Sequence, residues 1–135
     1  MTITDILKQG IDFSNADVTA QDMMADFTDH RVGMQLDSEE VTIVVKDSVY
    51  SLENGIRDDC HAVMRMSTAD MCGAIDNSYD LMEIREKGEL IKGDATDPSM
   101  AVHFMSTFPL FDAMVRLYEE DNEFKKQVDE IKSAQ

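Results

Sequence analysis

Tryptophan is absent from this sequence, and cysteine and proline occur only twice each in 135 residues. Cys60 and Cys72 are too few to build a disulfide framework, so a reducing compartment is expected. Apolar runs are short as well. None approaches the ~18 residues of a membrane-spanning helix, and Met1–Gly10 has neither the basic nor the apolar segment of a secretory signal. These absences predict a cytoplasmic protein that is not integral to a membrane.

Positive charge is also scarce. Twelve basic residues stand against 28 acidic ones, and the formal net charge of −16 makes this an acidic protein. Binding to nucleic acid requires clustered lysine and arginine, and electrostatic attachment to anionic lipid requires the same, so the composition argues against both. The acidic residues are spread along the chain, which is typical of a solvated surface. The length favours a single domain over residues 1–135 with its own core.

Motifs of known catalytic machinery are missing. The chain has no Gly-rich phosphate loop, no G-x-S-x-G elbow and no H-E-x-x-H. Cys60, His61, Cys72 and His103 are the residue types of a zinc site, but their spacing fits no zinc-binding motif. An enzyme hypothesis would rest on Cys72 as a nucleophile with His61 or His103 nearby. We therefore expect a protein that is not an enzyme and holds neither a metal nor a cofactor.

The middle of the chain is predicted to be a β-sheet that follows a helical N-terminal third. Val18–His30 carries a short apolar stripe at helical spacing, and Thr19 is its expected N-cap. Alternating and β-branched residues predict strands after it. These strands are Val32–Leu36, Val41–Lys46, Val49–Leu52 and His61–Met66. Asp47–Ser48 can turn the chain, which makes the second and third strands a hairpin.

Two short helices and one more strand are predicted next. Ser67 or Thr68 can cap the first helix, with Asp70 three residues after Ser67, close to a capping box. The second helix covers Asp80–Glu86, and the strand lies within Gly88–Asp94, between two glycines.

The last part of the chain is predicted to be helical. Asp97–Pro98 begins a long helix, because aspartate can cap it and proline needs no donor in the first turn. Pro109 predicts a kink or a break near Thr107, and Asn122 is expected to cap a final helix. The order of elements predicts an α+β fold, in which helices pack on one face of a mostly antiparallel or mixed sheet of about five strands.

Methionine is abundant, with 11 copies, and most fall on apolar faces. A flexible, polarizable side chain suits a surface that binds varied apolar partners, but it also fills an irregular core well. The long helix carries a matching stripe at steps of three and four residues: Met100, Phe104, Phe108, Phe111, Val115 and Tyr118. Composition alone leaves open whether these residues are core or the lining of a ligand cavity.

The segment Val63–Asp94 resembles the type-2 sterol carrier protein domain. That family enters a short helix through T-x-x-M-S-x-x-D, to which VMRMSTAD (Val63–Asp70) corresponds, and its G-K-L-K-I-x-G-[ND] strand is similar to GELIKGD (Gly88–Asp94). The hairpin VTIVVKDSVYSLENG lies where the family has its strands. The resemblance covers roughly residues 31–115, flanked by an N-terminal helical segment and a C-terminal helix.

The resemblance implies a tunnel between the sheet and the helices, lined by the helix after Ser67 and by the last helix. The ligand-binding candidates are Met66, Met71, Ile75, Met82, Phe104, Met105, Phe108 and Phe111. The implied function is non-catalytic binding or transfer of a lipid or another long apolar molecule, such as a fatty acyl chain, a sterol or a quinone. The physical basis is the burial of apolar surface, with few polar groups needed.

A second hypothesis keeps the same fold with a collapsed cavity. The chain would then be a protein-interaction or homodimerisation module. In that case an apolar stripe on the last helices would be exposed to a partner. Its expected members are Phe111, Val115, Tyr118 and Phe124.

Overall fold

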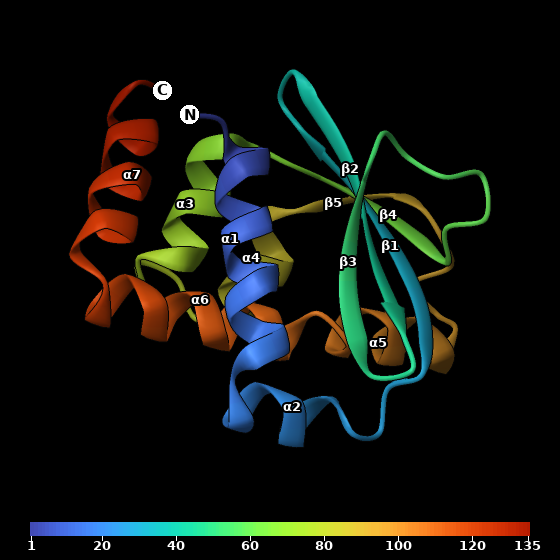
Figure 1. The fold of residues 1–135 in the computed structure, drawn as a ribbon. Coiled ribbons are helices and arrows are strands. Elements are labelled where there is room, and N and C mark those ends of the chain that lie inside the picture. Colours follow the sequence, from blue (N-terminus) through green and yellow to red (C-terminus); the bar gives the residue numbers. More distant parts are fainter.

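The computed structural model describes residues 1–135, apart from the side chain of Leu81. The elements follow in the order α1 (Ile3–Ala16), α2 (Val18–Met24), β1 (Asp29–Leu36), β2 (Glu39–Lys46), β3 (Val49–Asn54), β4 (Ala62–Met66), α3 (Thr68–Ile75), α4 (Leu81–Lys87), β5 (Glu89–Lys92), α5 (Pro98–Met105), α6 (Phe108–Glu120) and α7 (Asn122–Ser133) (Figure 1). Of the helices described, none is both long enough and apolar enough to cross a membrane.

The strands form one five-stranded mixed sheet in the order β3-β2-β1-β4-β5. Hairpins make the β1–β2 and β2–β3 pairs antiparallel, and β4–β5 is antiparallel as well. The central β1–β4 pair is parallel, with Met34 beside Met64 and Leu36 beside Met66. Helices α1, α3, α6 and α7 lie to one side of this sheet in Figure 1. The α+β prediction, with a mixed sheet, is confirmed.

Local chemistry explains the turns and several helix starts. Asp47 and Ser48 adopt positive φ angles of 52° and 64°, as the predicted hairpin turn requires. The Ser67 hydroxyl caps α3 by accepting from the backbone N–H of Asp70 at 3.0 Å. Gly93 has φ of 123°, a conformation that a side chain would strain, and this lets the chain leave β5 sharply.

Two cap predictions are wrong. Asp17, not Thr19, caps α2 by accepting from Ala20 N–H at 2.9 Å, and α2 ends at Met24 instead of continuing to His30. The reason is tertiary: from Asp29 onward the backbone pairs with β2, and these strand hydrogen bonds replace the helical ones. Asp121, not Asn122, caps α7 by accepting from Phe124 N–H at 3.0 Å.

The predicted break at Pro109 is present. Helix α5 ends at Met105, Ser106 and Thr107 form the junction, and α6 starts at Phe108 with proline in its first turn. A proline there lacks only a donor that would have no helical partner. The apolar stripe that was predicted to lie on one long helix is therefore divided between α5 and α6.

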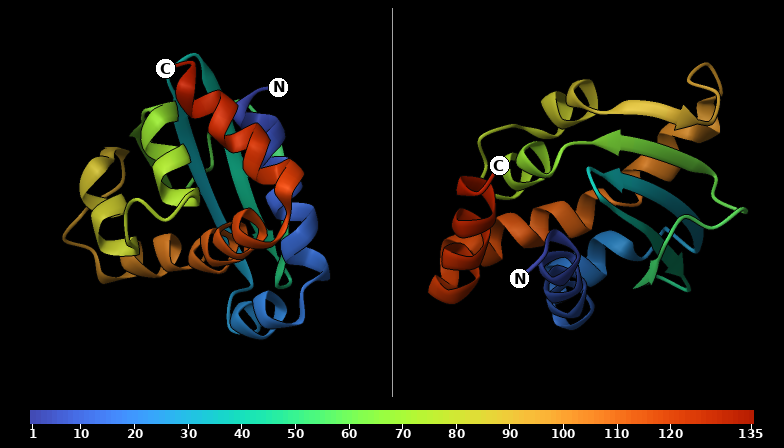
Figure 2. Two further views of the ribbon diagram at one scale, coloured as in Figure 1. Left: turned by 90° about the vertical axis from the view of Figure 1, so that its left-hand side faces the viewer. Right: turned by 90° about the horizontal axis from the view of Figure 1, so that it is seen from above.

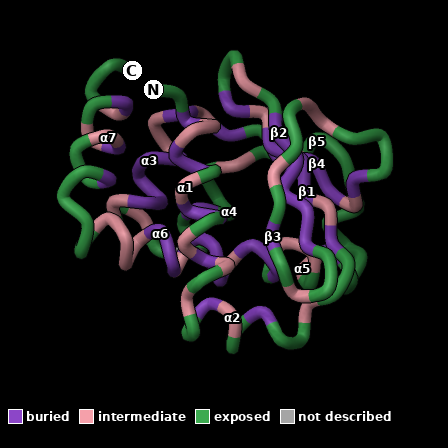
Figure 3. Tube along the Cα trace, viewed as in Figure 1, coloured by how far each residue is buried: buried purple, intermediate pink, exposed green. Residues whose placement is uncertain are grey.

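The core fills the space between the sheet and helices α1, α3, α6 and α7 (Figure 3). A Cβ added at Gly10 on α1 would lie 2.5 Å from Sδ of Met114 on α6, so the missing side chain allows close packing of these helices. Helix α1 also contacts the C-terminal helix. The Gln9 side-chain amide on α1 donates to Gln127 on α7 at 2.8 Å, and Figure 2 shows these two helices side by side.

The exposed stripe of the interaction hypothesis is wrong as predicted. Phe111 and Phe124 are only 5% and 2% exposed, and Val115 and Tyr118 are half-buried. Helices α6 and α7 pack on each other and on α1 and α3, which covers this side of the stripe.

Candidate functional site: an apolar pocket beside the sheet

A pocket of about 250 Å³ lies between the sheet and helices α4, α5 and α6. The sheet contributes Val32, Met34, Met64 and Met66. The helices and the α5–α6 junction contribute Met82, Ile84, Arg85, Ala101, Phe104, Met105, Thr107, Phe108 and Phe111. Every second side chain of a strand points to the same face of the sheet. The parallel register of β1 and β4 places Met34 beside Met64 on the face that forms this wall.

The break between α5 and α6 shapes the opposite wall. Phe104 lies in the last turn of α5, whereas Phe108 and Phe111 lie in the first turns of α6. Because the helix is interrupted between them, aromatic rings from two differently directed helices line the same space. Gly88 lies behind Met64, one of the lining residues. A Cβ there would approach Cε of Met64 to 2.6 Å, so its absence leaves room for this methionine.

The lining contains little polar chemistry. The Thr107 hydroxyl donates to the carbonyl of Phe104 at 2.7 Å and is thus already bonded. Among the described residues, no buried side-chain nitrogen or oxygen lacks a hydrogen-bond partner. The interior of the pocket therefore has no polar group reserved for a ligand, and its chemistry is that of methionine and phenylalanine side chains.

Arg85 is the charged member of the lining, and it is exposed. The other four arginines, at positions 31, 57, 65 and 116, each form an ion pair with a carboxylate. Within the described part of the chain, Arg85 makes neither an ion pair nor a hydrogen bond. An unpaired guanidinium next to an apolar pocket is a suitable donor for a carboxylate or phosphate group.

The structure separates the eight residues predicted from the sequence into two groups. Six of them line the pocket: Met66, Met82, Phe104, Met105, Phe108 and Phe111. Met71 and Ile75 do not, because α3 packs on α6 and α7 and buries both of them completely in the core. The role of these residues in ligand binding stays a prediction.

Sequence reasoning missed much of the sheet wall. Val32, Met34 and Met64 line the pocket but were not among the candidates. A signal was available for Met64, since it alternates with Met66 in HAVMRM and the two must share a face. For Val32 and Met34 the signal was the parallel partner strand, which local sequence does not reveal.

The residue types of the zinc hypothesis fall into different places. His61 and His103 come together, but Cys60 faces the Thr42 hydroxyl at 3.7 Å and Cys72 is buried in α3. No group of three histidine, cysteine, aspartate or glutamate side chains, over the residues that are described, is placed to hold a metal ion. Burial raises the pKa of the Cys72 thiol to about 11.

Of three comparisons with known proteins, the one with solved structures identifies the fold. No protein-family model matches the sequence, and no curated protein matches it. A solution structure of a conserved hypothetical protein from Thermus thermophilus, described as possibly a sterol carrier protein, superposes with a TM-score of 0.59 at 10% identity, over 84% of this chain and 86% of that one. Sterol carrier protein 2 gives 0.58 at 10% identity, over 82% and 92%. The ubiquinone synthesis protein UbiJ-SCP2 gives 0.57 at 11% identity, over 84% and 99%.

These structural neighbours are proteins with a sterol-carrier-protein-2 domain, and the chain has the fold of that domain. The resemblance seen at Val63–Asp94 is thereby confirmed at the level of fold. At 10–11% identity the likeness concerns the fold alone.

Proposed function

We propose that this protein binds or carries a long apolar molecule, without catalysis, in the pocket between the sheet and α4–α6. The observation that carries this proposal is the pocket itself, whose walls are almost wholly methionine, phenylalanine and aliphatic side chains. The fold supports it, since the solved neighbours are named for sterol carriage and for ubiquinone synthesis. The buried Cys72 thiol, with its raised pKa, supports a non-catalytic role.

The pocket volume sets what it can hold. A cavity of about 150 Å³ takes one benzene ring, so about 250 Å³ corresponds to roughly ten carbon atoms. Ten buried methylenes would contribute ~8 kcal/mol, and association costs at least ~4 kcal/mol. The remaining ~4 kcal/mol corresponds to a Kd near 1 mM. Part of one alkyl chain fits this space, whereas the fused rings of a sterol exceed it.

Tighter binding requires a wider pocket or further contacts at its mouth. Met82 and Met105 line the pocket and are 66% and 47% exposed, so their flexible side chains can cover a ligand that protrudes. Together with Arg85 they form an apolar mouth with one positive charge. A fatty acyl chain with an anionic head is the ligand that best matches this arrangement.

The test compares two neighbouring positions on α5. Ala101 lines the pocket, whereas Val102 is 45% exposed and does not. Ala101→Phe should fill the space and weaken binding of a fluorescent fatty acid at least tenfold, while Val102→Phe should bind as the wild type does. Native mass spectrometry of freshly purified protein should detect a co-purified lipid. Absence of any binding with the protein at about 1 mM, or equal effects of the two variants, would overturn the proposal.

An interaction module with the same fold is the second proposal. The exposed apolar side chains Met82, Val102 and Met105 on α4 and α5 support it, and two of them, Met82 and Met105, also line the pocket. A homodimer through this surface should be lost in Met105→Ser by light scattering, and a strict monomer in the wild type counts against it. Two unpaired, buried cysteines support a cytoplasmic location for either function.

A further inference from the structure

Every histidine of the chain lies in one cluster, although the three are far apart in sequence. His30 belongs to β1, His61 directly precedes β4, and His103 belongs to α5. The Nδ1 atoms of His30 and His103 are 2.9 Å apart. The rings of His61 and His103 stack at 4.0 Å with an interplanar angle of 9°, and those of His30 and His61 are 6.4 Å apart. We call these three residues the histidine clasp.

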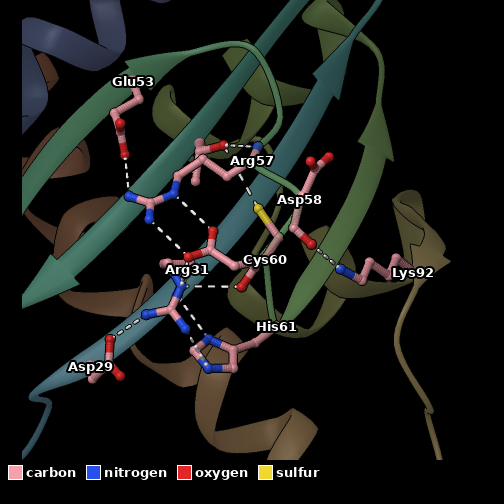
Figure 4. Close-up of polar contacts among 10 residues, drawn as sticks. Asp29, Arg31, Glu53, Arg57, Asp58, Cys60, His61 and Lys92 are labelled. Carbon is pink, nitrogen blue, oxygen red and sulfur yellow. Dashed lines mark hydrogen bonds and ion pairs between the residues drawn. The ribbon is translucent and has the colours of Figure 1, made fainter.

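Fixed charges surround the clasp. The guanidinium of Arg31 lies 3.2 Å from Nε2 of His61, and the backbone N–H of Arg31 donates to Nδ1 of the same ring at 3.1 Å (Figure 4). Arg31 is itself paired with Asp29 and Asp59. Asp97, the N-cap residue of α5, supplies the negative charge on the side of His103.

The clasp is arranged for neutral imidazoles and not for a metal ion. Both ring nitrogens of His61 face Arg31, and its ring lies parallel to that of His103, so these two rings do not converge on one point. The contact between the Nδ1 atoms of His30 and His103 requires one nitrogen to donate and the other to accept. When both rings are protonated, both nitrogens become donors and repel each other.

Burial also favours the neutral form of the three imidazoles. His30 is 8% exposed, and burial, with repulsion from His103 and Arg31, lowers its pKa in spite of Asp29. Burial and the same positive neighbours also lower the pKa of His61. For His103, burial and Arg31 lower the pKa, while Asp97 and Asp29 oppose this shift.

The helix that the clasp holds is the one that walls the pocket. Among the residues of α5, Met100 is buried in the core, whereas Val102 and Met105 are exposed. Ala101, Phe104 and Met105 face the pocket, on either side of His103. The contacts of His103 with His30 and His61 thus join α5 to the sheet, next to the buried Met100 and to Phe104, which packs against the core.

We propose that the histidine clasp is a pH-sensitive latch, which holds α5 against the sheet at neutral pH and releases it at mildly acidic pH. Release would open the apolar pocket, a consequence that rests on the proposed function. The latch itself does not depend on any ligand.

The direction of the effect follows from linkage. Because the closed state lowers the pKa of all three rings, it binds protons less readily than the released state, whose histidines titrate near the ordinary value of about 6.5. The latch is thus intact above about pH 7 and weakens as the pH falls below about 6.5. Each additional proton bound on release favours the released state about tenfold per pH unit.

Hydrogen exchange of the ligand-free protein tests the latch at pH 7.5 and 5.5, after correction for intrinsic rates. We expect protection of the α5 amides to fall at least about tenfold at pH 5.5, while α1 and α7 change little. His103→Asn, whose amide can bond His30 without titrating, should clearly reduce this pH dependence, and what remains comes from His30 and His61. Val102→Asn, the matched control on α5, should retain it.

Two results would overturn the latch: wild-type α5 that responds to pH no more than α1 does, or a pH response in His103→Asn as large as that of the wild type. If His103→Asn does not fold, the wild-type comparison of α5 with α1 decides alone. Since no ligand is present, failure of this experiment leaves the binding proposal standing, and failure of ligand binding leaves the latch standing.

Discussion

The hydroxyl of Tyr50 on β3 accepts a hydrogen bond from the backbone N–H of Leu110 on α6 at 3.2 Å, and it donates one to the carbonyl of Ser106. In an uninterrupted helix this N–H and this carbonyl, four residues apart, would bond to each other. The hydroxyl thus replaces the backbone hydrogen bond that is missing where the helix is interrupted next to Pro109. It ties the α5–α6 junction, and with it one wall of the pocket, to the sheet.

Removing this hydroxyl should destabilise the protein. Tyr50 is 2% exposed, so Tyr50→Phe leaves the Ser106 carbonyl buried without its donor, and we expect the free energy of unfolding in urea to fall by about 1–3 kcal/mol. Tyr118→Phe is the control. Its half-buried hydroxyl bonds Asp129 near solvent, and its loss should cost less than about 0.5 kcal/mol. Equal losses in the two variants would contradict a structural role for Tyr50.

A second prediction concerns the link between α3 and α7. Lys132 Nζ donates to Asp76 at 2.6 Å, and Asp76 is 11% exposed. Burial raises the pKa of Asp76, but hydrogen bonds from Lys132 and Ser78 outweigh it, so the pKa lies below the usual value. Lys132→Met should lower the free energy of unfolding at pH 7 by about 1 kcal/mol, a modest figure because Lys132 is partly exposed.

The pH dependence of this loss has a definite sign. A carboxyl with a lowered pKa stabilises the fold above its ordinary value and loses that contribution as the pH falls through the folded one, here below about 4. The difference between Lys132→Met and the wild type should shrink in that range. Lys126→Met on the same helix, whose ammonium makes no ion pair among the described residues, should behave as the wild type at every pH. A difference that is constant from pH 7 to pH 3 would be inconsistent with the Asp76 link.

Arg85 should select the head group of a ligand. We expect Arg85→Gln to weaken binding of a fluorescent fatty acid about tenfold, because a charge-assisted hydrogen bond is lost, and to leave binding of its methyl ester unchanged. Arg65→Gln is the matched control, since Arg65 is exposed, pairs with Glu89 and lies outside the pocket. An equal loss for the acid and the ester would mean that Arg85 acts through packing alone.

The cysteines should be unreactive in the folded protein. Cys72 is completely buried with a raised pKa, and Cys60 is buried beside Thr42, so little thiolate is accessible at pH 7.5. Iodoacetamide should label neither residue until urea unfolds the chain. Cys72→Ala should also leave fatty-acid binding unchanged. Rapid labelling of Cys72 in the native protein would instead favour the nucleophile hypothesis.

Features encoded within a few residues could be predicted from the sequence. The Asp47–Ser48 turn, the Ser67 cap and the interruption at Pro109 each depend on the chemistry of one short segment, and each is found where it was predicted. The same holds for the alternating strands before Ser67. These predictions succeed because a cap, a turn or a missing backbone donor acts on its immediate neighbours.

Features that depend on contacts between segments far apart in the sequence could not be predicted in this way. Met71 carries the same apolar signal as Met66, yet α3 faces α6 and α7, so one methionine is core and the other lines the pocket. A helical stripe specifies that a face is buried but not which element buries it. Likewise, the parallel pairing of β1 with β4 and the docking of α5 bring His30, His61 and His103 together. Only the tertiary structure places these rings in contact, because their contacts join segments that are not neighbours along the chain.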